Sequence, residues 1–114
     1  MSGPSPELQT LKAEFFRTMA HPARIRILEV LSQHRELSVQ ALQQRLSLDQ
    51  PIVSQQLAKL RAHGVVTTRK QGTTVIYALA DPGIADLLTI AKEILNRRLT
   101  GTKTLLYELR RSAF

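Results

Sequence analysis

The feature that most restricts the fold of this chain is a change in residue spacing at Gly64. Before this glycine, Val53, Leu57 and Leu60 recur every three or four residues, which is the spacing of one buried helix face. After it come two segments rich in β-branched residues, VVTTRK and TVIYALA, separated by a glutamine and a glycine. That pattern is typical of a β-hairpin. Glycine is common just past a helix end, so we expect a helix that leads directly into a hairpin.

The residues before Gly64 predict two helices joined by a short turn. The segment RELSVQALQQRL predicts one helix with Ser38 as its N-cap, and a second helix is predicted over 50–63. Three residues separate them, and the last of these, Asp49, is a good N-cap for the second helix. Pro51 falls in the first turn, where proline is tolerated. Two helices joined in this way form a helix-turn-helix, and a hairpin directly after them forms the wing of a winged helix.

Further helices are predicted on both sides of this unit. Residues 7–20 have helical spacing, and Asp81-Pro82 begins a long helix with a broad apolar face. Gly101 is expected to interrupt that helix before a last helical segment. The predicted fold is therefore mainly α with a small β-hairpin. It is a winged helix-turn-helix in which four helices precede the hairpin, and a fifth helix and a short sixth segment follow it.

Length and composition exclude several functions. The 114 residues are expected to form one domain over 7–114, behind a disordered leader at residues 1–6. The chain has no cysteine, which excludes disulfides, thiolate catalysis and Cys-based zinc sites and fits a cytoplasmic location. No apolar run approaches the roughly 20 residues that span a bilayer, so no membrane partner is expected. Histidine–acid pairs, nucleophile motifs and phosphate-binding glycine loops do not occur, so the chain is not expected to be an enzyme.

The charge distribution indicates a polyanionic partner. The formal net charge is +7 at pH 7, and the isoelectric point of the sequence is near 10.6. The segment from Gln50 to Ala80 contains no acidic residue. A basic surface without acids suits a nucleic acid. The basic residues of this segment are Lys59, Arg61, Arg69 and Lys70.

The predicted helix over 50–63 carries side chains that can read DNA. The side chains opposite its buried face are Gln50, Ser54, Gln55, Ala58, Lys59 and Arg61. Glutamine pairs bidentately with adenine in the major groove, and serine donates to bases or phosphates. Lys59 is better placed for a phosphate, a contact that adds affinity without sequence information. Gln56, next to Leu57, is expected at the border of the buried face.

Two long phrases of the chain resemble a known family. FRTMAHPARIRILEVL and QQRLSLDQPIVSQQLAKLRAHGVVTTRKQGTTVIYAL are similar to the ArsR/SmtB family of winged-helix transcriptional repressors, and the likeness covers about residues 10–97. The resemblance implies a homodimer that binds double-stranded DNA at a palindromic operator and usually represses transcription. The DNA-contacting positions that it implies are Gln50, Ser54, Gln55 and Lys59 in the helix, Arg69, Lys70, Gln71, Gly72 and Thr73 in the wing at 69–74, and Arg24 at a phosphate-contacting position.

Apolar residues in the first and last helices favour the dimer. A small winged helix cannot cover all of them, and exposed apolar surface of this size marks an association site. The alternative is that the stripe of the fifth helix completes the core of its own chain. A two-fold dimer would place two recognition helices about 34–36 Å apart, which is one turn of DNA. The residues expected in the dimer interface are Leu8, Leu11, Phe15, Leu87, Leu88, Ala91, Ile94 and Leu95.

The chain departs from the family at the positions that bind metals. Metal-sensing members often carry a Cys-Val-Cys phrase at the start of the third helix, where this chain has Ser38 and Gln40. Another family site uses Asp, His and Glu on the last helix, but residues 82–114 contain no histidine. No metal or other cofactor is therefore expected. The sequence leaves the signal open, since a small molecule in the dimer crevice, a partner protein or no dissociable signal all agree with it.

The expected function is that of a sequence-specific DNA-binding transcriptional regulator, a homodimeric repressor that binds an inverted-repeat operator through the helix over 50–63 and the wing at 69–74. The alternative is a winged-helix module that binds another protein and has no specific affinity for DNA. Binding to a palindromic fragment of the chain's own promoter separates the two functions.

Overall fold

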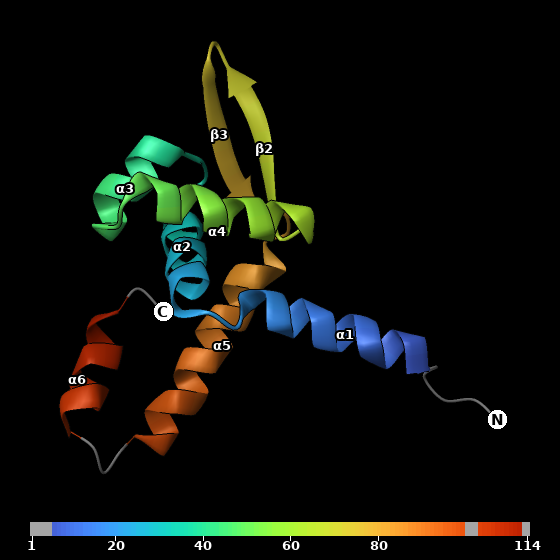
Figure 1. The fold of residues 1–114 in the computed structure, drawn as a ribbon. Coiled ribbons are helices and arrows are strands. Elements are labelled where there is room, and N and C mark those ends of the chain that lie inside the picture. Colours follow the sequence, from blue (N-terminus) through green and yellow to red (C-terminus); the bar gives the residue numbers. More distant parts are fainter. Residues whose placement is uncertain (1–5, 100–102, 113–114) are drawn as a thin grey trace.

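The computed structural model describes residues 6–99 and 103–112 (Figure 1). The first five residues of the expected leader lie outside this range, and its sixth, Pro6, is the first residue of a helix. The helix break expected at Gly101 also lies outside the described residues. The elements in chain order are α1 (Pro6–Met19), α2 (Pro22–Gln33), β1 (Leu37–Ser38), α3 (Val39–Leu46), α4 (Gln50–Ala62), β2 (Val66–Gln71), β3 (Thr74–Leu79), α5 (Gly83–Arg98) and α6 (Lys103–Arg111).

The helix-turn-helix forms at α3 and α4, and local interactions explain its ends. The Ser38 hydroxyl accepts a hydrogen bond from the backbone N–H of Ala41 (3.1 Å), so the expected N-cap is confirmed. Ser47 ends α3 in the left-handed region at φ 54°, which turns the chain toward α4. Asp49 has the extended backbone of an N-cap, but its side chain makes no capping hydrogen bond. Gly64 follows α4 at φ 71°, the conformation in which glycine is favoured.

The core lies where α2, α3 and α4 meet the base of the hairpin. The core is built from apolar side chains, and their removal from water is the main contribution to the free energy that holds the three helices together. Partly buried residues of β1, β3 and α5 pack around it, among them Leu37, Tyr77 and Leu87. The largest fully buried side chains are Ile27, Leu28, Leu42, Val53, Leu57, Leu60 and Val65.

The predicted hairpin is present, and it belongs to a three-stranded sheet of order β1-β3-β2. β2 and β3 pair antiparallel from Val66 opposite Leu79 to Gln71 opposite Thr74, so Gly72 and Thr73 form a two-residue turn. Gln71, expected to separate the strands, is instead the last residue of β2. β1 was not predicted, because two residues are too short to show the alternation that marks a strand.

Two helices extend away from this core (Figure 1). Within residues 6–19 of α1, only Thr18 and Met19 are buried. Among the described residues of α5, Ile84 alone is fully buried. The fifth helix therefore does not bury its whole apolar stripe within one chain. No helix in the described part of the chain is long and apolar enough to cross a membrane.

Candidate nucleic-acid interface

The fourth helix, α4, separates its apolar and polar side chains onto two faces. Val53, Leu57 and Leu60 are completely buried and fix the helix against the core. The polar residues predicted to face DNA remain exposed on the opposite side: Gln50, Ser54, Gln55 and Lys59, together with Ala58 and Arg61. Small and amide side chains on an exposed, anchored helix can approach base edges in a major groove.

The wing carries a second group of exposed polar residues. β2 and β3 project beyond the helices, with the turn at their far end (Figure 1). Gly72 has φ 64° while Thr73 keeps a negative φ, which is the pattern of a turn with glycine at its first central position. The exposed predicted residues of the wing are Arg69, Lys70, Gln71, Gly72 and Thr73.

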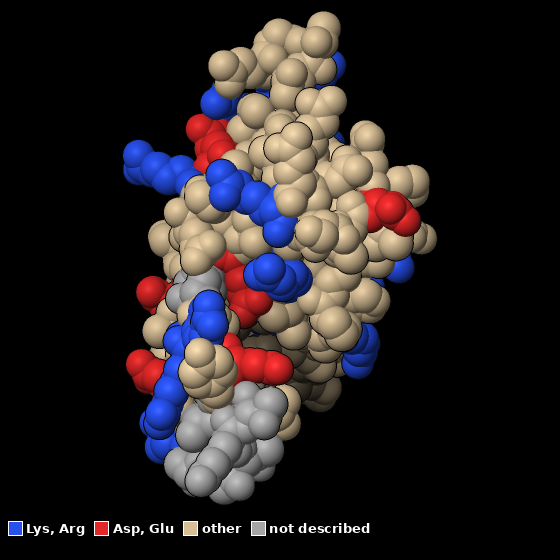
Figure 2. Space-filling view, turned by 90° about the vertical axis from the view of Figure 1, so that its left-hand side faces the viewer, with Lys and Arg blue, Asp and Glu red and all other residues tan. Residues whose placement is uncertain are grey.

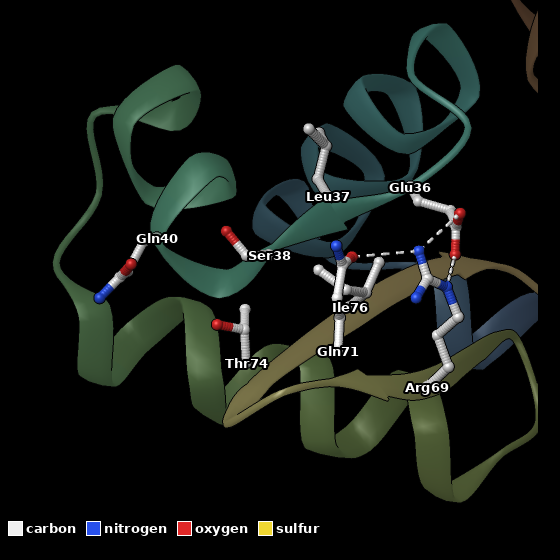
Figure 3. A pocket seen from close by; sticks show the side chains of 8 residues that line it. All are labelled: Glu36, Leu37, Ser38, Gln40, Arg69, Gln71, Thr74 and Ile76. Carbon is white, nitrogen blue, oxygen red and sulfur yellow. Dashed lines mark hydrogen bonds and ion pairs between the residues drawn. The ribbon is translucent and has the colours of Figure 1, made fainter.

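Arg69 differs from the other wing residues because an acid holds its side chain. Its guanidinium pairs with Glu36 through two hydrogen bonds, Nε–H to Oε2 and Nη2–H to Oε1, the second at 3.1 Å. Figure 3 shows the pair at the edge of a cavity of about 590 Å³ between the wing and the start of α3. The hydrogen bond from Arg69 holds the pKa of the Glu36 carboxyl below its usual range. The sequence could not show this pairing, because 33 residues separate the two partners.

The same cavity contains the two positions where metal-sensing family members carry cysteines. Ser38 and Gln40 line it (Figure 3), and the Ser38 hydroxyl already accepts the capping hydrogen bond of α3. Within the described residues, no group of three or more His, Asp or Glu side chains is placed to hold a metal ion.

Arg24, predicted to contact a phosphate, makes hydrogen bonds inside the protein. Its Nε–H donates to Oε1 of Gln56 (2.9 Å), and its Nη1–H donates to the backbone oxygen of Thr18 (3.0 Å). Gln56 is only 7% exposed, although Gln55 beside it is exposed. The burial of Gln56 could be expected from its position next to Leu57. Its hydrogen bond with Arg24 could not be expected from the sequence.

Charges of both signs mix on the face that carries α6. Figure 2 shows this face, where Asp and Glu side chains lie among the Lys and Arg side chains over its lower half. A mixed surface of this kind offers a polyanion no continuous basic path. The acid-free segment 50–80 instead forms α4 and the wing.

The predicted dimer residues are mostly exposed. Leu87 and Leu88 are the exceptions, because both pack partly against the core of their own chain. Four further large apolar residues are exposed as well: Phe16, Ile90, Leu105 and Tyr107. The predicted residues with exposed side chains are Leu8, Leu11, Phe15, Ala91, Ile94 and Leu95.

A helix-turn-helix anchored by its second helix and followed by a β-hairpin defines a winged helix-turn-helix protein, a class whose second helix enters DNA. Comparison with known proteins agrees with this class. The model of a helix-turn-helix domain matches residues 19–69. The HTH-type transcriptional regulator Rv0081 of Mycobacterium tuberculosis is 45% identical over 106 residues, which cover 93% of each chain. Its crystal structure has a TM-score of 0.75 at 48% identity, covering 86% of this chain and 97% of that one.

Two further relatives extend the likeness. The transcriptional repressor PagR of Bacillus anthracis is 35% identical over 82 residues, covering 72% of this chain and 82% of PagR. The solution structure of the homodimeric winged helix-turn-helix DNA-binding domain of Mb0332 from Mycobacterium bovis, a possible ArsR-family regulator, has a TM-score of 0.74 at 26% identity. It covers 87% of this chain and 94% of that domain. The chain belongs to the ArsR/SmtB family of winged-helix transcriptional regulators. It is therefore a DNA-binding transcriptional regulator, and the expectation that it is not an enzyme is confirmed by the family.

Proposed function

We propose that this chain is a homodimeric repressor that binds an inverted-repeat operator. In this proposal α4 is the recognition helix, one copy from each protomer entering the major groove at one half-site. The observation that carries the proposal is the division of α4 into two faces. Its apolar face is completely buried at Val53, Leu57 and Leu60, so its polar face is held rigidly outward.

The polar residues of α4 have different roles in the proposal. Gln50 and Gln55 read base edges, because an amide can pair bidentately with adenine. Ser54, between them on the same face, donates to a base or a phosphate. Lys59 lies nearer the end of the helix and contacts a phosphate.

The wing and the apolar surface complete the complex. Lys70, Gln71, Gly72 and Thr73 lie at the far end of the hairpin, where they can follow the backbone or the adjacent minor groove. Exposed Leu11 and Phe15 of α1, with Ile94 of α5, belong to the surface that joins the two protomers. The homodimeric state of the Mb0332 domain supports this assembly. The name of PagR as a repressor supports the direction of regulation. The proposal includes a cytoplasmic location, because the relatives of the chain are transcriptional regulators.

Footprinting tests the proposal. Hydroxyl-radical cleavage of the chain's own promoter fragment should show two protected half-sites with centres about 10–10.5 base pairs, or a multiple of that, apart. The protection should have two-fold symmetry, because an isologous dimer presents the same surface twice. Uniform protection, or no protection at low salt, would contradict specific binding and favour the protein-interaction module.

A further inference from the structure

Helix α1 is attached to the rest of the molecule at one end. Its first turns point away from the domain (Figure 1), and the side chains of Leu11 and Phe15 are exposed on this helix. Burial begins only at Thr18 and Met19, in the last turn. The direction of α1 relative to the recognition helix is therefore set at a single joint, formed by the end of α1 and the start of α2.

Arg24 connects the two sides of this joint. It lies in the first turn of α2 and is half-buried. Its Nη1–H donates to the backbone oxygen of Thr18 (3.0 Å), which lies in the last turn of α1, where carbonyl groups lack a partner within the helix. A cation is also favoured there by the helix dipole.

The other side of the same guanidinium holds the recognition helix. The Nε–H of Arg24 donates to Oε1 of Gln56 (2.9 Å), at a point where the Gln56 side chain is almost completely buried. Gln56 lies directly between Gln55, which faces outward, and Leu57, which is in the core. One planar group thus joins the last turn of α1 to the middle of α4, and its fork geometry fixes the direction of both bonds.

We propose that Arg24 is a positioning residue which, through Gln56, sets the direction of α1 relative to α4 and thereby the operator spacing that the dimer accepts. The inference rests on the proposed function, because α1 contributes to the dimer surface there. If α1 fixes where the partner protomer lies, the joint fixes the separation and relative rotation of the two recognition helices. Arg24 then acts on DNA recognition without contacting a phosphate.

Operators of altered spacing test this role. One base pair inserted between the half-sites moves them apart by about 3.4 Å and rotates one against the other. The wild-type dimer should lose affinity for such an operator by about tenfold or more, whereas Arg24→Ala and Gln56→Leu should lose less than about threefold. The double variant should behave like Arg24→Ala, because Arg24→Ala already removes the bond to Gln56 together with the bond to Thr18. Gln56→Glu keeps an acceptor for the guanidinium, so this variant should discriminate between the two operator spacings as the wild type does.

The salt dependence of binding separates positioning from phosphate contact. Arg24→Ala should leave the slope of log affinity against log salt unchanged, since no counterion is released at this residue. A slope reduced by about one unit per half-site, with spacing discrimination retained, would make Arg24 a phosphate contact and overturn the proposal. The matched control is Arg26→Ala, because Arg26 is exposed on the same helix and makes neither of these bonds.

A measurement without DNA distinguishes failure of this inference from failure of the proposed function. The chain has no cysteine, so Ala58→Cys on the exposed face of α4 gives one spin-labelling site per protomer. The distance between the two labels, measured by double electron–electron resonance, should have a narrow distribution in the wild-type background. It should broaden with Arg24→Ala and Gln56→Leu but not with Arg26→Ala. An unchanged distribution in both variants would overturn the role of Arg24 whatever the DNA measurements show. The absence of a dipolar interaction in the wild-type background would instead contradict the homodimer of the proposed function, and the inference would fall with it.

Discussion

Two neighbouring glutamines of α4 have opposite environments. Gln55 is exposed beside Ser54, whereas Gln56 is 7% exposed and accepts a hydrogen bond from Arg24. An exposed amide on a rigid helix has free donors and acceptors, while the buried one has its carbonyl occupied. At the scale of single residues, we therefore propose that Gln55 reads a base and that Gln56 supports the fold.

The first prediction concerns Gln55. Replacing it with alanine should weaken operator binding by about 1–3 kcal/mol and relax the base preference at one position of each half-site, because a bidentate contact to a base is lost. Fluorescence anisotropy with operators mutated one base pair at a time measures both effects. Gln33→Ala, at an exposed glutamine at the end of α2, is the control. An equal loss of affinity for all sequences would make Gln55 a backbone contact.

The second prediction concerns Lys59, near the end of the exposed face of α4. Lys59→Ala should weaken binding to all DNA sequences alike and reduce the salt slope by about one unit per half-site, since one phosphate contact is lost. Titrations at several salt concentrations measure this slope. If the slope stays at the wild-type value, Lys59 does not contact a phosphate.

The sequence predicted which face of a helix is buried better than it predicted which side chains form hydrogen bonds with each other. The spacing of Val53, Leu57 and Leu60 correctly predicted which face of α4 is buried, because residues three or four positions apart lie on the same side of a helix. The bond from Arg24 to Gln56 joins residues 32 positions apart. Such a contact depends on how helices pack, and no local pattern encodes it. The role of Arg24 as a phosphate contact is implied by the family resemblance alone and stays a prediction.

At the scale of elements, the wing is a hairpin whose strand β3 is paired with β1. β1 pairs with β3 through Leu37 opposite Tyr77 and Ser38 opposite Ile76. The Glu36–Arg69 pair adds a charged connection across the same sheet. The alternation of β-branched residues and Gly72 predicted the hairpin, but the exact turn depends on the pairing register, which placed Gln71 in the strand.

The third prediction concerns the charge on Glu36. Because this carboxylate neutralises the charge of Arg69, Glu36→Gln should raise the affinity for non-specific DNA and make the salt slope steeper by up to about one unit per protomer. Titration with a scrambled duplex at several salt concentrations measures both. An unchanged slope would show that Arg69 does not approach DNA even when its partner is uncharged.

The pH dependence of the Glu36–Arg69 pair tests whether the two side chains remain paired in solution. Arg69 lowers the pKa of Glu36 in the folded protein. The contribution of the pair to stability is therefore fully present above the unfolded pKa and is lost as the pH falls through the lower folded value. The NMR signal of the Arg69 Nε–H should stay constant from neutral pH to about pH 5 and move only below it. A shift centred at the usual pKa of a glutamate would show that the pair does not persist in solution.

At the scale of the whole molecule, the exposed apolar residues of α1 and α5 form the surface that we propose joins two protomers. Leu11 is 62% exposed on a helix that projects from the domain (Figure 1), and Ile94 is exposed on α5. The sequence predicted this surplus of apolar surface from composition and spacing. It could not predict that Leu87 and Leu88 are shared with the core, because that depends on the angle at which α5 crosses α2.

The fourth prediction tests the dimer surface. Leu11→Asp should convert the dimer to a monomer, because a carboxylate in an apolar interface loses its hydration without gaining a partner. Sedimentation equilibrium measures the mass. Ile52→Asp is the matched control, since Ile52 is also an exposed apolar residue (41%) but lies on α4, and this variant should remain a dimer. A dimeric Leu11→Asp variant would exclude α1 from the interface.

In the proposed function, two copies of this chain recognise one DNA sequence through the polar face of α4. Equilibrium titrations of the protein into the chain's own promoter fragment and into a scrambled duplex of equal length, at about 150 mM salt, test this recognition. We expect two chains bound per operator and a preference of about 10³-fold or more for the promoter fragment. Equal affinity for the two duplexes at that salt concentration would contradict it.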